Sequence, residues 1–274
     1  MDQHTSKHPS GLPTREEAEE AKRKRNLTPV QNKLPKDILH REDWFPTPIY
    51  FADHPTEAQT NQRLIKDIDR WYDRDQEGII RSNSLGWHSA VDMHHRSEYN
   101  HFTKWLIEKV NQMMTSMGYH PKFEAFCDNM WANINKRYSH NRNHVHPGAL
   151  WSGVYYVRAP ESSGRIWFTD PRGEAHTMIP RFNTDKNKPK PKDFWREVYY
   201  EPTPGRLIVF PGWLTHEVEP NLNMEFKEDD RKGWRYSISF NFVQRYKPGE
   251  TVIKEAKGHD GGGGVFADDL KETT

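Results

Sequence analysis

Two histidines one residue apart begin the segment HVHPGALWSGVYYV, which runs from His144 to Val157. If HVH is extended, the side chains of His144 and His146 project from the same face of the chain and could bind one metal ion. A third candidate, His216, follows a predicted strand at 206–210. Three imidazoles at a mononuclear site with open positions suit Fe(II) and related first-row ions. We therefore expect these histidines to form a metal site.

The histidine pair is weak evidence by itself, because the chain contains 15 histidines and such a spacing can arise by chance. The pair gains weight because His216, Arg235 and Ser237 follow it in order, each beside a strand of the same predicted sheet. The alternative is that these histidines are ordinary surface or core residues without a ligand.

The last predicted strand, RYSISFNF at 235–242, alternates polar and apolar residues. Its polar row consists of Arg235, Ser237, Ser239 and Asn241. On a surface strand this row would face water, whereas in a barrel that encloses a small ligand it can face inward. An arginine on an inward row is costly to bury unless it meets a carboxylate or a phosphate. In such a barrel, Arg235 therefore indicates an anionic ligand.

The elements around these residues predict a mainly β fold. Apolar residues recur at helical spacing in 58–75 and in 97–118, the second with Ser97 as its N-cap and Gly118 as its stop. Helices followed by many short strands favour a barrel or sandwich braced by helices on one side. The predicted strands are rich in β-branched and aromatic residues and lie within 124–138, 150–160, 164–172, 195–202, 205–212 and 234–246.

The composition disfavours several classes of protein. The chain has 274 residues and a formal net charge of +1, so a nucleic-acid partner is not excluded but is not favoured. No stretch approaches the roughly 20 apolar residues of a membrane helix, and the N-terminal residues lack the apolar core of a secretory signal. The single cysteine, Cys127, can form no intrachain disulfide and fits a reducing compartment. We therefore expect a cytoplasmic protein that does not contact a membrane.

Low-complexity segments flank and interrupt one predicted domain, residues 39–247. Residues 1–38 are polar and charged and predict a disordered tail. Residues 248–274 contain four consecutive glycines and predict a flexible tail. The Lys/Pro-rich segment at 181–193 predicts an exposed insertion loop.

Three blocks of the sequence, taken together, resemble a known family. They are NHVHPGALWSGVYYVRAPESSGRIWFTDPR, PTPGRLIVFPGWLTHEVEPN and RYSISFNF. The sequence resembles the 2-oxoglutarate/Fe(II)-dependent oxygenases of marine bacteria and their phages over roughly residues 42–244, without the Lys/Pro-rich segment. The resemblance implies a double-stranded β-helix (jelly-roll) core with flanking N-terminal helices. It also implies the cytoplasm of a bacterium or of a phage-infected host cell.

The resemblance implies an Fe(II) site with 2-oxoglutarate bound beside the metal. The superfamily motif is His-x-Asp/Glu, then a distal His, then Arg-x-Ser. His144 matches the first histidine, and His216 matches the distal one. Arg235 and Ser237 match the pair that binds the distal carboxylate of 2-oxoglutarate. A planar guanidinium can hold such a carboxylate through two hydrogen bonds, which agrees with the need of a buried Arg235 for an anion.

One position departs from that motif, because His146 stands where Asp or Glu is expected. Either the site has three histidines, or Asp170 in FTDPR supplies the carboxylate and His146 has another role. We prefer His146 as the ligand because of its spacing from His144. Asp170 could equally turn the chain before Pro171 or pair with Arg172.

The resemblance implies an enzyme, a dioxygenase that hydroxylates a substrate with O2 and releases succinate and CO2; the sequence does not identify that substrate. Tyr155 could donate a hydrogen bond to 2-oxoglutarate, and three asparagines could line the substrate pocket. Ordinary strand packing accounts for each of these four residues equally well. The three asparagines are Asn133, Asn135 and Asn241.

Two other classes of protein stay open. A cupin-type metalloenzyme that does not use 2-oxoglutarate would account for the histidines, but it would leave Arg235 and Ser237 without a role. The first cupin motif also normally has a Glu shortly after HxH, and 147–151 contains none. A non-catalytic jelly-roll binding or structural protein would need no metal at all.

Overall fold

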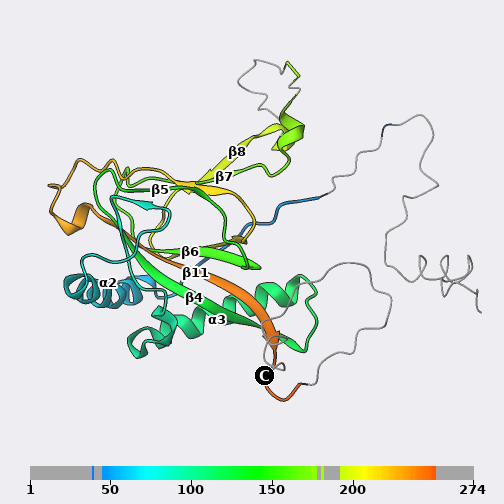
Figure 1. Cartoon of the computed structure of the whole chain (residues 1–274), viewed down its shortest axis with the longest axis horizontal. Coiled ribbons are helices and arrows are strands. Elements are labelled where there is room, and N and C mark those ends of the chain that lie inside the picture. The colour runs from blue at the N-terminus through cyan, green and yellow to red at the C-terminus, as the bar shows by residue number, and fades with distance from the viewer. Residues whose placement is uncertain (1–38, 40–44, 178–179, 182–191, 251–274) are drawn as a thin grey trace, which may run out of the picture. The chain divides into compact units, whose positions relative to one another are not determined.

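Figure 1 shows a computed structural model of the chain, which divides into two units between Pro46 and Thr47. The fold described below is that of the second unit. The predicted tail 1–38 lies outside the described residues, and most of the predicted tail 248–274 and of the predicted loop 181–193 does so too. The structure describes residues 39, 45–177, 180–181 and 192–250.

The described chain is mainly β, with its two α-helices near the N-terminal end, as predicted. The strands are two to thirteen residues long and are joined by turns, loops and 3-10 helices. In chain order the elements are β1 Tyr50–Asp53, α2 Glu57–Arg74, β2 Asn83–Ser84, β3 Trp87–His88, η1 Met93–His95, η2 Ser97–Tyr99, α3 Asn100–Ser116, β4 Phe123–Asn135, β5 His140–His144, β6 Trp151–Arg158, β7 Ile166–Thr169, η3 Gly173–His176, η4 Lys192–Phe194, β8 Glu197–Tyr200, β9 Arg206–Pro211, β10 His216–Val218, η5 Arg231–Gly233 and β11 Arg235–Tyr246.

The strands form two antiparallel sheets. One sheet has the order β1-β9-β6-β11-β4-β3, and the other has the order β2-β5-β10-β7-β8. From β4 onward the chain passes back and forth between the two sheets, and only β7 and β8 follow each other within one sheet, as a hairpin of the five-stranded sheet. In Figure 1 the helices α2 and α3 lie against one side of the six-stranded sheet, while β5, β7 and β8 lie on its other side. The six-stranded sheet is therefore the middle layer, with a different environment on each face.

Alternation along β11 places its apolar row on the helix side of this middle layer. Tyr236, Ile238, Phe240 and Phe242 are fully buried in one core cluster with α2 and α3 residues such as Ile68. Burial of each such side chain contributes about 1.5–3 kcal/mol. Because side chains alternate along a strand, the polar row that begins at Arg235 must face the second sheet.

The helices are amphipathic, as their spacing predicts, but one predicted boundary is wrong. Ser97 does not cap α3, because it begins the separate 3-10 turn η2, and α3 itself begins at Asn100. Tyr99, with φ −100° and ψ 0°, occupies the N-cap position of α3 and separates the helix from the 3-10 turn. At the other end α3 ends at Ser116, and Gly118 follows with φ +78°, a conformation that favours glycine.

Candidate functional site

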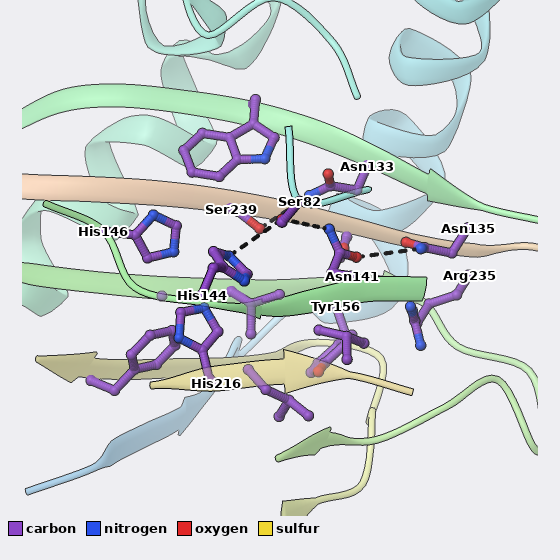
Figure 2. A pocket seen from close by; sticks show the side chains of 17 residues that line it. Ser82, Asn133, Asn135, Asn141, His144, His146, Tyr156, His216, Arg235 and Ser239 are labelled. Atoms are coloured by element: carbon purple, nitrogen blue, oxygen red, sulfur yellow. Dashed lines mark hydrogen bonds between the residues drawn. The ribbon is translucent and has the colours of Figure 1, made fainter. Parts of the chain in front are cut away.

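The three histidines predicted as metal ligands lie together between the sheets (Figure 2). Each of His144, His146 and His216 offers one ring nitrogen, and these nitrogens all lie within 4.8 Å of one another. His144 ends β5 and pairs directly with His216 at the start of β10, so two neighbouring strands bring these imidazoles side by side. His146 lies beyond β5 and is held by a hydrogen bond from its N–H to the Gly212 carbonyl, 2.8 Å.

Backbone carbonyls orient two of the three rings. Nδ1 of His144 lies 2.6 Å from the Arg142 carbonyl oxygen, and Nδ1 of His216 lies 2.8 Å from that of Leu214. A carbonyl accepts only from N–H, so Nδ1 carries the proton and Nε2 keeps the lone pair that a metal requires. Burial lowers the pKa of His216 to about 3 and that of His146 to about 4, which favours the neutral form.

Arg235 lies at the other end of the same cavity (Figure 2). Its side chain is 1% exposed, and Nη1 donates to the carbonyl oxygens of Ser163 and Gly164. Burial lowers the pKa of Arg235 to about 10, which still leaves the guanidinium charged at neutral pH. Nη2 is buried and has no hydrogen-bond partner among the described residues. A buried cation with an unsatisfied donor is the expected receptor for an anion.

The cavity between these two ends is lined by polar side chains of both sheets. Asn133, Asn135 and Ser237, all predicted from the sequence, contribute to this lining. Two further polar atoms, Oδ1 of Asn133 and the hydroxyl of Tyr156, are buried without a partner among the described residues. The lining residues are Ser82, Trp131, Asn133, Asn135, Asn141, His144, His146, Gly153, Val154, Tyr156, Ile166, Phe210, His216, Val218, Arg235, Ser237 and Ser239.

The expectation for Tyr155 needs correction, because this side chain faces the helices. Its hydroxyl donates to Oδ1 of Asn61 on α2 at 2.8 Å. In the sheet register Tyr155 pairs with Ile238, which belongs to the helix-facing row, whereas Tyr156 pairs with Ser237 of the polar row. Tyr156, which sequence reasoning missed, is therefore the tyrosine in the cavity.

Asp170, the alternative carboxylate ligand, is not brought to the histidines. Its carboxylate accepts hydrogen bonds from the backbone and guanidinium of Arg172 and contacts Nε2 of His176 at 3.0 Å. Hydrogen bonds from Arg172 lower the pKa of Asp170 to about 2. Asp170 belongs neither to the group of three histidines nor to the lining of the cavity. The geometry therefore favours the three-histidine alternative.

Other cavity residues carried different signals in the sequence. Ser239 belongs to the alternating polar row of β11 and could be found from that pattern. Asn141 and Ser82 could not be found from the sequence. Ser82 precedes the two-residue strand β2, and Asn141 is brought close to it only because β5 pairs with β2. Asn241 lies outside the inner cavity, where its amide contacts Ser152 and Asn129, and it lines a second pocket nearer the surface.

Comparisons with known proteins agree with this geometry. Residues 129–241 match the family model described as "Putative 2OG-Fe(II) oxygenase". This range contains the three histidines, Arg235 and Ser237. A comparison with curated proteins found no match. The family match favours an oxygenase over the cupin-type and the non-catalytic alternatives. It does not bear on a marine or phage origin, which stays a prediction.

Solved structures share the fold at low sequence identity. The epimerase SnoN of nogalamycin biosynthesis, described as non-heme and α-ketoglutarate dependent, aligns with a TM-score of 0.50 and 11% identity over 77% of this chain and 89% of SnoN. SnoN in complex with Fe3+, α-ketoglutarate and nogalamycin RO gives 0.50 and 11% over 74% and 82%. A Pseudomonas putida prolyl-4-hydroxylase gives 0.47 and 14% over 73% and 94%. The SnoN likeness confirms the predicted double-stranded β-helix core.

No helix in the described part of the chain combines the length and the apolar character needed to cross a membrane. The cytoplasmic location and the role of nucleic acid stay predictions.

Proposed function

We propose that this chain, whose residues 129–241 match the model of a 2-oxoglutarate/Fe(II) oxygenase family, hydroxylates an organic substrate with O2 while 2-oxoglutarate is converted to succinate and CO2. The family match supports the enzyme class and its two cofactors, Fe(II) and 2-oxoglutarate. The observation that carries the proposal is the pairing of a metal-ligand cluster with a buried, incompletely satisfied arginine in one cavity.

The donor set suits the metal. We propose that His144, His146 and His216 hold Fe(II), since neutral imidazoles are good ligands for this ion and the cluster leaves coordination positions open. Iron and 2-oxoglutarate, when bound together, supply the activation of O2 coupled to oxidative decarboxylation. Three imidazoles bring no negative charge, so in this proposal the anionic ligand to the metal is the cosubstrate itself.

Arg235 and its neighbours suit the distal carboxylate of 2-oxoglutarate. The two carbonyls that accept from Nη1 fix the plane of the guanidinium and leave Nη2 free to donate. Burial raises the pKa of Tyr156 to about 12, so its hydroxyl stays protonated and can donate to the same anion. Ser237 adds its hydroxyl as a third hydrogen-bond donor in the lining of this cavity. The lining of the cavity contains no aspartate or glutamate, so these donors are available to an anionic ligand.

The backbone beside Arg235 is adapted to its position. Gly164 has φ +94°, and a Cβ at this residue would lie 2.4 Å from the Glu219 carbonyl oxygen and 2.8 Å from Nη1 of Arg235. Only glycine allows the carbonyl of residue 164 to approach the guanidinium in this way. The apolar residues Val154, Ile166 and Phe210 line the cavity between its ends and limit the access of water.

The proposal is tested by incubating the full chain with Fe(II), O2 and 2-oxoglutarate and measuring succinate. We expect succinate above the metal-free background even without the substrate, through slow uncoupled turnover. The product should be lost in His216→Ala, which removes a ligand, and in Arg235→Gln, which removes the anion receptor. His101→Ala and Arg63→Gln are matched controls, because both residues are exposed on α3 and α2.

Two outcomes would contradict the proposal in different ways. Stoichiometric metal binding without succinate would favour the cupin-type alternative. Failure to bind Fe(II) or Ni(II) stoichiometrically, or equal binding by a His144→Ala, His216→Ala double variant, would favour a non-catalytic jelly-roll protein.

A further inference from the structure

A second pocket lies on the outer side of the histidines. Its volume is about 670 Å³, whereas the inner cavity that ends at Arg235 has about 50 Å³ by the same measure. The two spaces share Ser82, Trp131, His144 and His146 in their linings, so the histidine cluster lies where they meet. A pocket of this size is in the range of small-molecule sites, while the inner cavity is too small for a second organic ligand.

The outer pocket has an unbalanced charge. Its lining contains two arginines, Arg81 and Arg142, and no aspartate or glutamate. Neither arginine forms an ion pair with any residue in the described part of the chain. The remaining lining is neutral at neutral pH and includes Ser82, His88, Val91, Asn129, Trp131, Asn143, Val145 and Asn241.

The two arginines are held next to each other by the backbone. The N–H of Arg142 donates to the Ser82 carbonyl at 2.9 Å, which joins β5 to the segment that carries Arg81. Nη2 of Arg142 also lies 3.5 Å from the Arg81 carbonyl oxygen. The two positive side chains therefore arise from adjoining segments at the rim, on the same pocket as the metal-ligand candidates.

We propose that the outer pocket binds the oxygenase substrate, and that this substrate is a small molecule carrying a carboxylate or phosphate group bound by Arg81 and Arg142. This inference rests on the proposed function. Two adjacent cations without a protein counter-ion repel a cationic ligand and raise the local concentration of anions. Arginine binds both carboxylates and phosphates through two parallel hydrogen bonds.

Other lining residues suit the remainder of such a molecule. Asn241 is held in place by Ser152, which donates to its Oδ1 at 2.7 Å, and by its own donation to Asn129 at 2.7 Å. Trp131 stacks on His88 with ring centroids 5.1 Å apart and an interplanar angle of 10°, which gives the pocket a rigid aromatic wall. A substrate with its anion at the rim and an apolar body along Trp131 would present its far end to the histidines.

The charge preference is tested by titration calorimetry on the full-length, metal-free protein with three probes: benzoate, phenyl phosphate and neutral benzyl alcohol. We expect at least one anionic probe to bind about tenfold or more tightly than the alcohol. The double variant Arg81→Gln, Arg142→Gln should lose this preference. The control Arg63→Gln should keep it, because Arg63 is an exposed arginine on α2. The tighter of the two anions identifies the group that the substrate carries.

The inner cavity could also attract an anion, so Arg235→Gln separates the two sites. A preference that persists in Arg235→Gln and disappears in the double variant supports the outer site. Equal binding of all three probes, or a preference lost in Arg235→Gln and kept in the double variant, overturns the inference. If the double variant melts below the parent protein, Arg142→Glu alone replaces it, since this residue is exposed.

The binding experiment uses metal-free protein and needs no turnover. Absence of succinate would therefore refute the proposed function without changing the result on the outer pocket.

Discussion

Arg235 is the residue on which the chemistry of the inner cavity depends most. Its guanidinium is buried, carries a charge and keeps one nitrogen without a partner among the described residues. A buried donor in this condition costs about 1–3 kcal/mol until a ligand satisfies it. In the proposed site the receptor is therefore in place before the anion binds, and relief of that cost would increase the affinity for the anion.

Replacement of Arg235 by lysine tests whether geometry as well as charge is required. Lysine keeps the positive charge, but its single ammonium cannot bind two carbonyls and a carboxylate in one plane. We expect Arg235→Lys to raise the KM for 2-oxoglutarate by about tenfold or more, with a smaller effect on kcat, because the residue lies at the end of the cavity away from the histidines. Succinate formation at varied 2-oxoglutarate measures both constants. An unchanged KM would show that Arg235 does not contact the cosubstrate, and Arg63→Lys is the control.

Asp170 has a structural role that its pH dependence can reveal. Hydrogen bonds from Arg172 hold its pKa at about 2, below the value of about 3.9 expected in an unfolded chain. A lowered pKa stabilises the fold fully above the unfolded value, and this contribution is lost as the pH falls toward the folded value. We expect Asp170→Asn to lower the free energy of unfolding by about 1–2 kcal/mol at neutral pH. The difference from the parent protein should shrink below about pH 4.

Urea unfolding at several pH values measures this effect, and Ni(II) titration of the same variant tests the metal site. We expect Asp170→Asn to bind metal normally and His146→Ala to bind it poorly. The reverse result would make Asp170 the third ligand.

The sequence indicated both His146 and Asp170 as candidates for the third ligand but could not distinguish them, because the answer depends on which loop packs beside β10. The local pairing of Asp170 with Arg172 was one of the alternatives read from the sequence, and the structure contains it.

At the scale of elements, β6 directs Tyr155 toward the helices and Tyr156 into the inner cavity, so the proposed function predicts different effects for their replacement. Tyr155 donates to the buried Asn61, so Tyr155→Phe leaves an unsatisfied acceptor and should cost about 1–2 kcal/mol of stability without changing the KM for 2-oxoglutarate. Tyr156→Phe removes a hydroxyl that has no partner among the described residues. It should leave stability nearly unchanged and raise the KM several-fold. Urea unfolding measures the stability of both variants, and succinate kinetics measure their KM for 2-oxoglutarate. The opposite pattern would mean that Tyr155, and not Tyr156, faces the cosubstrate.

The long strands could be predicted because they carry their own signals. The range predicted around β11 differs from the observed strand by one residue, and its alternation correctly separated a helix-facing row from a cavity-facing row. The face of Tyr155 could not be predicted, because Trp151–Val157 is buried at every position and such a run has no readable alternation. Pairing with β11 determines its faces. The strands β1, β2, β3, β5 and β10, each of two to five residues, were not predicted, since such short segments carry little pattern of their own and are defined by pairing.

At the scale of the whole molecule, the candidate site joins parts of the chain that are far apart in sequence. The histidines come from β5, the turn after it and β10, all on the five-stranded sheet or its edge, whereas Arg235 begins the last strand of the six-stranded sheet. Composition and spacing could suggest that these residues share a site, but only the packing of the two sheets shows that they line one cavity. A ligand that spans this cavity would contact both sheets.

A bound metal should therefore stabilise the native protein. A ligand that binds only the folded state adds about 2.7 kcal/mol when its concentration is 100 times the Kd. For a domain of this size, that corresponds to a rise in Tm of about 5–10 °C. We expect Ni(II), used as a redox-stable substitute for Fe(II), to produce this rise in the parent protein and in Asp170→Asn, but not in His216→Ala. A chelator should reverse it. Scanning calorimetry measures each case, and an equal rise in His216→Ala would mean that the metal binds elsewhere.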